Sequence, residues 1–159
     1  MNLDPNKEYL DTAIYAAKAA SDLIIKSSKR EIKTFKSQTD LVTETDLASE
    51  KIISDIIKSK YPEHSILAEE SGLNESHSSQ YIWVIDPLDG TTNFVHKYPS
   101  YAVSIALINN GEPVVGVVIE MPLMNIYCAT INSPAYCNNF IIRCSDTNKL
   151  ILSLLVTGF

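Results

Sequence analysis

Basic residues, cysteines and long apolar runs are scarce in this sequence, and each shortage excludes a class of protein. Thirteen lysines and arginines stand against nineteen acidic residues, for a net charge of −6, and without a basic patch we expect no nucleic-acid partner. The three cysteines form no CxxC pair, so neither a disulfide framework nor a zinc knuckle is indicated, and we expect three reduced packing residues. No apolar run approaches the roughly 18 residues of a membrane helix, and the start MNLDPNKEYLD lacks the features of a secretion signal. We therefore expect a cytoplasmic protein without membrane contacts.

The length and hydrophobic content predict one domain over residues 1–159. A chain of 159 residues that is 45% hydrophobic can bury one core but is too short for two ordinary domains. Apolar residues recur at helical spacing from Leu10 to Ile24, which predicts an amphipathic helix ending near Arg30. Residues 36–40 are expected to form a turn or a short strand.

A second helix is predicted from a capping box. TETD at residues 43–46 has the spacing of that motif, which places Asp46 in the first turn. Tyr61 and Pro62 stop the helix. Its buried stripe is expected at Leu47, Ile52, Ile53, Ile56 and Ile57.

Short apolar runs follow and predict strands. The runs are SILAEE, YIWVID, YAVSIALI, EPVVGVVIE, NIYCATI and LILSLLVTGF. Asn110 and Gly111 give a hairpin signal between the third and fourth runs, and the polar LNESHSSQ is expected to be a loop. Helices followed by mostly antiparallel strands indicate an α+β fold, with two N-terminal helices packed on a largely antiparallel sheet.

The stretch WVIDPLDGTTNF places two carboxylates at the end of a predicted buried strand. Pro87 interrupts regular pairing, and the turn that follows can bring Asp86, Asp89 and the Leu88 carbonyl toward one point. Three oxygens on one turn suit a hard cation, and Mg²⁺ is the natural candidate. Gly90 then allows close backbone approach.

An anion site is predicted beside these carboxylates. If Thr91 and Thr92 open a helix, the free amides of its first turn can bind phosphate. The alternative is that Asp-Pro-x-Asp-Gly is ordinary turn chemistry. Further acids at Glu69, Glu70 and Asp46 favour the metal hypothesis, because acids clustered at the ends of apolar elements are costly without a cation.

These stretches resemble the inositol monophosphatase family of Mg²⁺-dependent, lithium-sensitive phosphatases. The matching blocks are DLVTETD, ILAEES and WVIDPLDGTTNFVHKYP, followed by VSIALINNGEPVVGVVIE. The resemblance runs over essentially the whole chain, which looks like the N-terminal portion of such an enzyme, apparently truncated. The family's C-terminal α/β half would then be absent.

The resemblance implies specific roles. Glu69 and Asp86 would bind a first metal with the Leu88 carbonyl, and Asp86 and Asp89 would bind a second. Asp46 and Thr91 would orient the attacking water, while the amides around Gly90, Thr91 and Thr92 would hold the phosphate of a small-molecule ester. Lys36 would lie near the site. The residues and roles together imply two-metal hydrolysis of a phosphate monoester, and full-length relatives would form homodimers.

Two departures from the family pattern affect this transfer. INSPAYCNN replaces a glycine-rich stretch and an Asn-Gly turn, and Asn can adopt the left-handed backbone at some cost. Trp83 is the only tryptophan, so the later Trp-Asp motif whose aspartate completes the second metal site has no counterpart. We therefore expect the 159-residue chain to be inactive.

Three hypotheses about function follow. The first is a phosphatase of inositol monophosphate or a similar small ester. The second is a nucleotide 3′-phosphate or sugar bisphosphate phosphatase. The third is a degenerate module that binds metal weakly or serves in an interaction, without catalysis.

Overall fold

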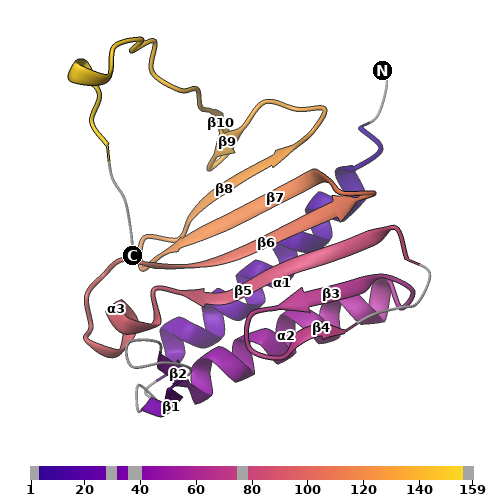
Figure 1. Cartoon of the computed structure of the whole chain (residues 1–159). Helices are drawn as coiled ribbons and strands as arrows, with labels where there is room; N and C mark the ends of the chain where they lie inside the picture. Colours follow the sequence, from indigo (N-terminus) through magenta and orange to yellow (C-terminus); the bar gives the residue numbers. More distant parts are fainter. Residues whose placement is uncertain (1–3, 28–31, 36–40, 75–78, 156–159) are drawn as a thin grey trace.

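The computed structural model describes residues 4–27, 32–35, 41–74 and 79–155. Within them lie two long helices and an eight-stranded sheet, as Figure 1 shows. The helices are α1 (Lys7–Lys26) and α2 (Glu44–Lys60), with a short α3 (Thr91–Val95). The strands of the large sheet are β3 (Ser65–Ala68), β4 (Gly72–Asn74), β5 (Tyr81–Asp89), β6 (Tyr101–Asn109), β7 (Glu112–Met121), β8 (Asn125–Thr130), β9 (Tyr136–Cys137) and β10 (Phe140–Ile141).

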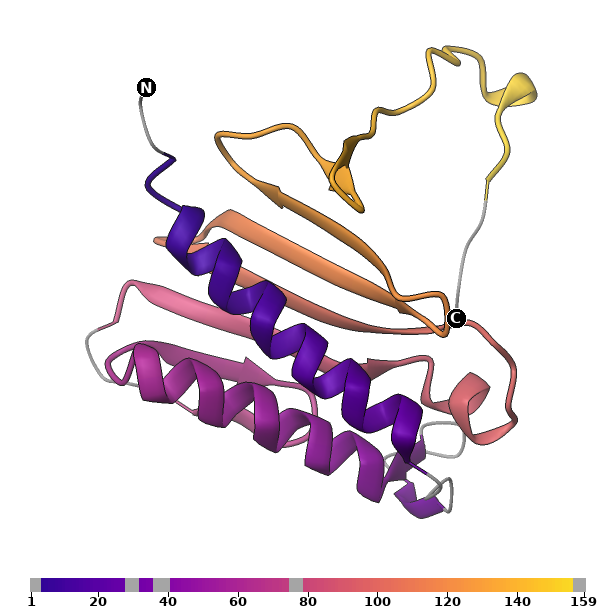
Figure 2. The same cartoon turned by 180° about the vertical axis from the view of Figure 1, so that it is seen from behind.

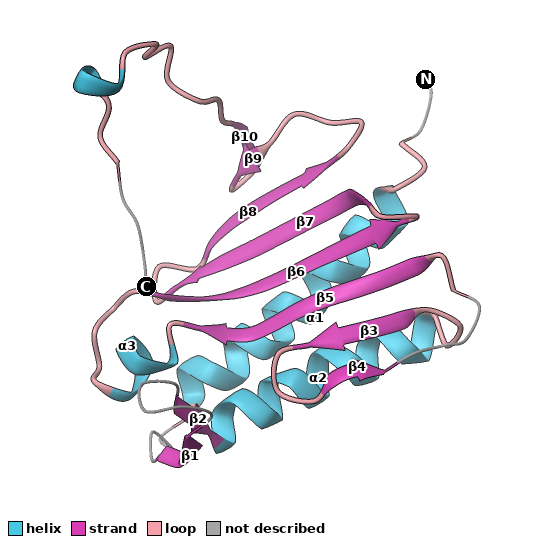
Figure 3. Cartoon of the chain, in the orientation of Figure 1, coloured by secondary structure: helices cyan, strands magenta, loops and turns pink. Residues whose placement is uncertain are grey.

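The sheet has the order β10-β9-β8-β7-β6-β5-β3-β4 and is mostly antiparallel, with β3 and β5 as its parallel pair. A separate two-stranded sheet pairs β1 (Ile32–Phe35) with β2 (Leu41–Thr43) just before α2. Figure 3 separates these strands from the helices by colour. The predicted α+β class is therefore confirmed.

Both long helices cover the same face of the sheet, as Figure 2 shows from behind. α1 packs on β6, β7 and β8, while α2 lies against β5 and alongside α1. The core fills the space between these layers, and its largest fully buried side chains include Trp83, Phe94, Ile53 and Leu107. No described helix has the length and apolar character needed to cross a membrane.

Local signals in the sequence explain most of these elements. Thr43 caps α2, because its hydroxyl accepts from the amides of Thr45 and Asp46 while Asp46 accepts from the Thr43 amide, which is the predicted capping box. The turn between β6 and β7 has positive φ at Asn110 and Gly111, as the Asn-Gly signal predicts.

Several expectations about the elements are wrong. α1 ends at Lys26 rather than near Arg30. Leu47 is 37% exposed, so the buried stripe of α2 does not include it. Leu73 and Asn74 of the predicted loop belong instead to β4, which pairs with β3. Cys144 is exposed and so is no packing residue.

The last predicted strand is also absent from the described part of the chain. Residues 150–152 form a 3₁₀ turn, and the described residues after it are not in a strand. The apolar side chains here point into solvent, with Ile151 90% and Leu154 94% exposed. Figure 1 shows this segment standing apart from the sheet. A strand needs a hydrogen-bonded neighbour, and none of the described residues runs beside it.

Candidate active site

Two neighbouring parallel strands bring the acidic residues together. β3 and β5 pair in register up to Ala68 and Ile85, so the residues that follow them, Glu69 and Asp86, emerge at the same edge of the sheet. The Glu69 amide donates to the Ile85 carbonyl oxygen at 3.1 Å, which ties the two strand ends together. The fold thus places acids that lie far apart in sequence side by side.

Asp86 is the electrostatic centre of this group. Its pKa is raised to about 7, first by burial, then by the charge of Glu69 and a hydrogen bond with it, and further by the charge of Asp89. The Leu88 amide donates to Asp86 Oδ1 at 3.2 Å and acts in the opposite direction. The carboxyl groups of Glu69 and Asp89 therefore lie close enough to oppose the ionisation of Asp86.

The donor set of this site suits a hard cation. Carboxylate and carbonyl oxygens are the ligands that Mg²⁺ takes in proteins. Among the described residues, however, no group of three or more His, Cys, Asp or Glu side chains is arranged to hold a metal ion. Asp86 and Glu69 lie within hydrogen-bond reach of each other, so two of the acidic side chains are already adjacent.

Pro87 produces the irregular end of β5 that the sequence predicts. The pairing with β6 shifts register between Asp86 and Asp89, which turns the chain out of the ladder. Leu88 is buried at 1% exposure, whereas Asp89 is exposed. The bulge thus anchors the turn through Leu88 and leaves the Asp89 carboxylate in solvent.

Asp46 and Thr91 meet at the start of two helices. The Thr91 hydroxyl lies 2.8 Å from Asp46 Oδ1 and 3.0 Å from the Leu88 carbonyl oxygen, and it can donate its single proton to either. Asp46 is only 1% exposed, and its other oxygen accepts from the amide and the hydroxyl of Thr43. The carboxylate is therefore held in one orientation by groups from both sides.

Gly90 joins the acidic turn to α3. Its φ of +81° is left-handed, and a Cβ at this position would lie 3.1 Å from the Ser100 carbonyl oxygen, so glycine is needed on both counts. α3 begins at Thr91, and the first amides of a helix have no acceptor within the helix. The amides of Thr91 and Thr92, in the first turn of α3, therefore lie directly after the acidic turn in the chain.

The structure assembles most of the residues that the sequence singled out. Glu69, Asp86, Leu88 and Asp89 lie at one end of the sheet, and Asp46 joins Thr91 beside them. Lys36 lies outside the described residues.

Two further polar residues of α2 were missed by the sequence reasoning. Ser49 Oγ donates to the Pro87 carbonyl oxygen at 2.7 Å, and Glu50 Oε2 accepts from the Glu70 amide at 2.9 Å. Their spacing of three and four residues from Asp46 was the available signal, since it places all three on one helix face.

The chain is similar to known proteins over nearly its whole length. The model of the inositol monophosphatase family matches residues 6–159. The chain is 40% identical over 159 residues to inositol monophosphatase 1 of Rattus norvegicus, covering 97% of this chain and 57% of that protein. It is also 40% identical over 153 residues to Nus factor SuhB of Escherichia coli, covering 94% and 57%, and 40% over 157 residues to the chloroplastic phosphatase IMPL1 of Arabidopsis thaliana, covering 94% and 42%.

Solved structures show the same fold. The extragenic suppressor protein suhB of Bartonella henselae matches with a TM-score of 0.86 at 31% identity, over 91% of this chain and 57% of that one. An inositol monophosphatase from Anabaena matches with a TM-score of 0.78 at 37% identity, over 91% and 52%. The chain spans about half the length of the relatives it matches.

Proposed function

The chain belongs to the inositol monophosphatase family, and on that premise we propose that it forms the metal- and phosphate-binding part of a Mg²⁺-dependent phosphatase. The substrate would be a small phosphate monoester such as inositol monophosphate. The observation that carries the proposal is the grouping of Glu69, Asp86 and Asp89, whose mutual repulsion contributes to the raised pKa of Asp86. A cation between them would offset that repulsion.

The proposed ligands follow from this grouping. Glu69, Asp86 and the Leu88 carbonyl would hold one Mg²⁺, and Asp86 with Asp89 would hold a second ion. When bound, the ions would lower the pKa of a water and stabilise the charge of the leaving oxygen.

Asp46 and Thr91 are proposed to orient the attacking water. If the Thr91 proton is donated to Asp46, 2.8 Å away, the hydroxyl oxygen keeps lone pairs that can accept a hydrogen bond from the water. Because Thr43 fixes the other oxygen of Asp46, the acceptor does not need to reorganise when substrate arrives.

The phosphate is proposed to bind at the start of α3. The amides of Gly90, Thr91 and Thr92 would donate to its oxygens, and Gly90 would keep the approach free of side-chain atoms. Lys36 is proposed to lie near this site. These groups would hold the ester with its phosphorus facing the water beside Asp46.

The wider properties also remain proposals. The family resemblance suggests lithium sensitivity and a homodimer in longer relatives, and the sequence features described above suggest a cytoplasmic location. Relatives carry the names Nus factor SuhB and phosphatase IMPL1, chloroplastic, so the expected absence of a nucleic-acid partner and the cytoplasmic location stay predictions.

The experiment is a calorimetric titration of Mg²⁺ into the 159-residue chain. We expect measurable binding that Asp86→Asn abolishes and Glu70→Gln retains, since Glu70 is not among the proposed ligands. Equal losses for the two variants would refute the ligand assignment.

A substrate panel then distinguishes the phosphatase hypotheses. Phosphate release is measured from inositol monophosphate, adenosine 3′-phosphate and a sugar bisphosphate, with and without Mg²⁺. We expect little turnover, because the second ion has only Asp86 and Asp89 as protein ligands. Turnover typical of the family would refute that requirement. A chain that binds no Mg²⁺ and releases no phosphate would be the non-catalytic module.

A further inference from the structure

The first half of the buried face of α2 is polar, which an ordinary packing helix would avoid. Asp46, Ser49 and Glu50 are 1%, 0% and 7% exposed, and the face becomes apolar only from Ile53 to Ile57. Burial of a hydroxyl and of carboxylates costs free energy unless each finds a partner. Each of the three has a partner in or directly beside the candidate active site.

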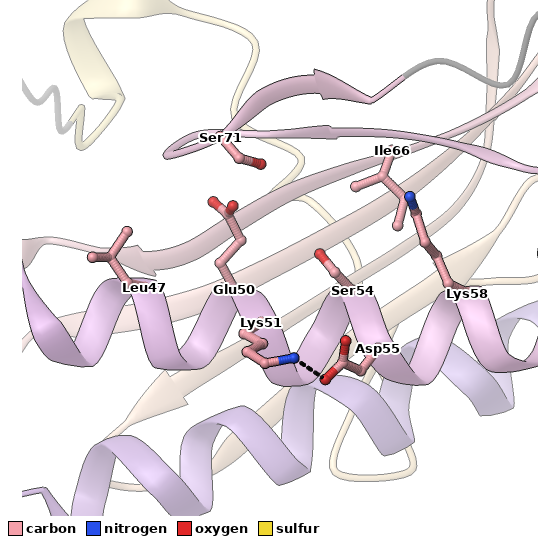
Figure 4. Close-up of a pocket in the computed structure, with 8 residues that line it drawn as sticks. All are labelled: Leu47, Glu50, Lys51, Ser54, Asp55, Lys58, Ile66 and Ser71. Carbon is pink, nitrogen blue, oxygen red and sulfur yellow. Dashed lines mark hydrogen bonds and ion pairs between the residues drawn. The ribbon is translucent and has the colours of Figure 1, made fainter.

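Glu50 fixes the peptide after Glu69. Its Oε2 accepts from the Glu70 amide at 2.9 Å, and the Glu69 amide on the other side is bound to the Ile85 carbonyl oxygen at 3.1 Å. The peptide planes on both sides of the Glu69 Cα are therefore held, one by the sheet and one by α2. Figure 4 shows Glu50 rising from α2 toward the turn that carries Ser71.

Ser49 fixes the peptide after Pro87 in the same way. Its hydroxyl donates to the Pro87 carbonyl oxygen at 2.7 Å, while the amide at the other end of that peptide, from Leu88, donates to Asp86 Oδ1 at 3.2 Å. One peptide plane thus links Ser49 to the Asp86 carboxylate. If this plane rotated, the Leu88 amide would no longer point at Asp86 Oδ1, and the Leu88 carbonyl that follows would change its direction.

We propose that Ser49 and Glu50 are positioning residues, which hold the two acidic turns at the separation and orientation needed to share a cation. The proposal rests on the proposed function, because it gives these residues a task only if Glu69 and Asp86 bind a metal. Neither residue is assigned a direct contact with metal or substrate. α2 would thereby set three parts of the site from one face, since Asp46 on the same face binds Thr91.

The surroundings of Glu50 should allow its variants to fold. It lines a solvent-open groove of about 260 Å³ between α2 and the turn after β3, together with Ser54, Lys58 and Ile66. Because the groove admits water, a shortened side chain here can be replaced by solvent. The fold should therefore tolerate the substitution better than one in a closed core.

The chain offers a matched control for Ser49. Ser21 on α1 is equally buried, at 0% exposure, and its hydroxyl has no hydrogen-bond partner among the described residues. Ser21→Ala and Ser49→Ala remove the same atom from the same kind of environment, and only the second removes a bond to the candidate site. For Glu50 the control is Asp55→Asn, an exposed acid on the same helix that pairs with Lys51.

The first measurement is Mg²⁺ affinity by calorimetry. Loss of a group that orients metal ligands typically lowers affinity about 10–100-fold, which is the expectation for Ser49→Ala and Glu50→Ala. Glu50→Gln keeps an acceptor for the Glu70 amide and should recover part of the affinity. Ser21→Ala and Asp55→Asn should stay within about 2-fold of the wild type. Wild-type affinity in folded Ser49→Ala and Glu50→Ala would overturn the proposal.

The second measurement needs no metal. Hydrogen exchange of the Glu70 amide, followed by NMR in EDTA, should accelerate at least about 10-fold in Glu50→Ala, less in Glu50→Gln and not at all in Ser21→Ala. Unchanged exchange would remove Glu50 from its role. If the wild type binds no Mg²⁺, the proposed function fails together with the metal-sharing task, and the exchange rate still decides whether Glu50 holds this turn.

Discussion

Replacement of Gly90 by alanine should destabilise the chain for two separable reasons. The first is backbone strain, because Gly90 has a φ of +81° and a left-handed conformation costs an L-residue about 1–2 kcal/mol. The second is contact, because the new Cβ would lie 3.1 Å from the Ser100 carbonyl oxygen and 3.3 Å from the Tyr101 Cα. Both neighbours are backbone atoms and cannot move aside as a flexible side chain would.

Gly111 provides the control that separates these causes. Its φ of +85° is nearly the same, and a Cβ there would meet nothing within 4 Å. Gly111→Ala should therefore cost only the strain, about 1–2 kcal/mol, whereas Gly90→Ala adds at least about 1 kcal/mol for overpacking. For a chain of this size 1 kcal/mol shifts Tm by about 2–4 °C. We expect a fall of about 2–8 °C for Gly111→Ala and of at least about 4–12 °C for Gly90→Ala.

The assay is urea unfolding followed by circular dichroism, with calorimetric Tm as a second measure. Gly116→Ala, at a position with an ordinary φ and open space, reports the effect of the methyl group alone and should be nearly neutral. Equal losses for Gly90→Ala and Gly111→Ala would refute the reasoning, since they would show that the Ser100 and Tyr101 backbone does not constrain the start of α3.

Three other predictions can be tested by the same unfolding measurements. Thr43→Ala should lower the free energy of unfolding by about 1–2 kcal/mol, because it removes the cap of α2. Thr43→Ser keeps the hydroxyl and should be about as stable as the wild type. Equal losses for the two variants would contradict the capping role. Asp86→Asn should stabilise the chain in EDTA at pH 8, since it removes repulsion with Glu69 and Asp89. Added Mg²⁺ should stabilise the wild type and leave this variant unchanged. If Mg²⁺ stabilised both proteins, the ion would bind elsewhere. Burial lowers the pKa of His64, so at this residue the unfolded state binds more protons as pH falls below about 6.5, and the contribution of His64 to stability falls there. His64→Asn, which keeps an acceptor for the Trp83 indole, should show a smaller loss between pH 7 and pH 5.5, and an unchanged pH profile would exclude His64 as the cause.

The sequence predicted those parts of the fold whose causes are local. The capping box at residues 43–46 and the turn at Asn110 and Gly111 depend on neighbouring residues alone, and both are present. The final strand was predicted from its apolar composition, which does not reveal whether a partner strand is available. The prediction that Leu47 is buried was wrong for a similar reason. Helical spacing identifies an apolar stripe on a helix, but it does not show which edge of the stripe contacts the sheet.

The residues of the candidate site could be predicted from the sequence, but the hydrogen bonds that hold them in place could not. The spacing of Asp86, Leu88 and Asp89 is visible in twelve positions of sequence. The bond from Ser49 to Pro87 spans 38 positions, and it exists because α2 lies against β5. The residues next to a helical serine in the sequence do not indicate such a distant partner. The role of Ser49 could therefore be found only from the three-dimensional structure.

The packing of α1 on β6, β7 and β8 also has a consequence for biosynthesis. The helix is complete at Lys26, but β7 starts only at Glu112, a delay on the order of ten seconds at ordinary translation rates. During that interval α1 can pair with α2 but lacks β7 and β8, two of the three strands that it packs on. Its inward face is largely alanine, at Ala13, Ala16, Ala17 and Ala20, and so offers a nascent chain little apolar area with which to aggregate. A ribosome stalled before Glu112 should therefore carry a helical pair that proteases can still cleave.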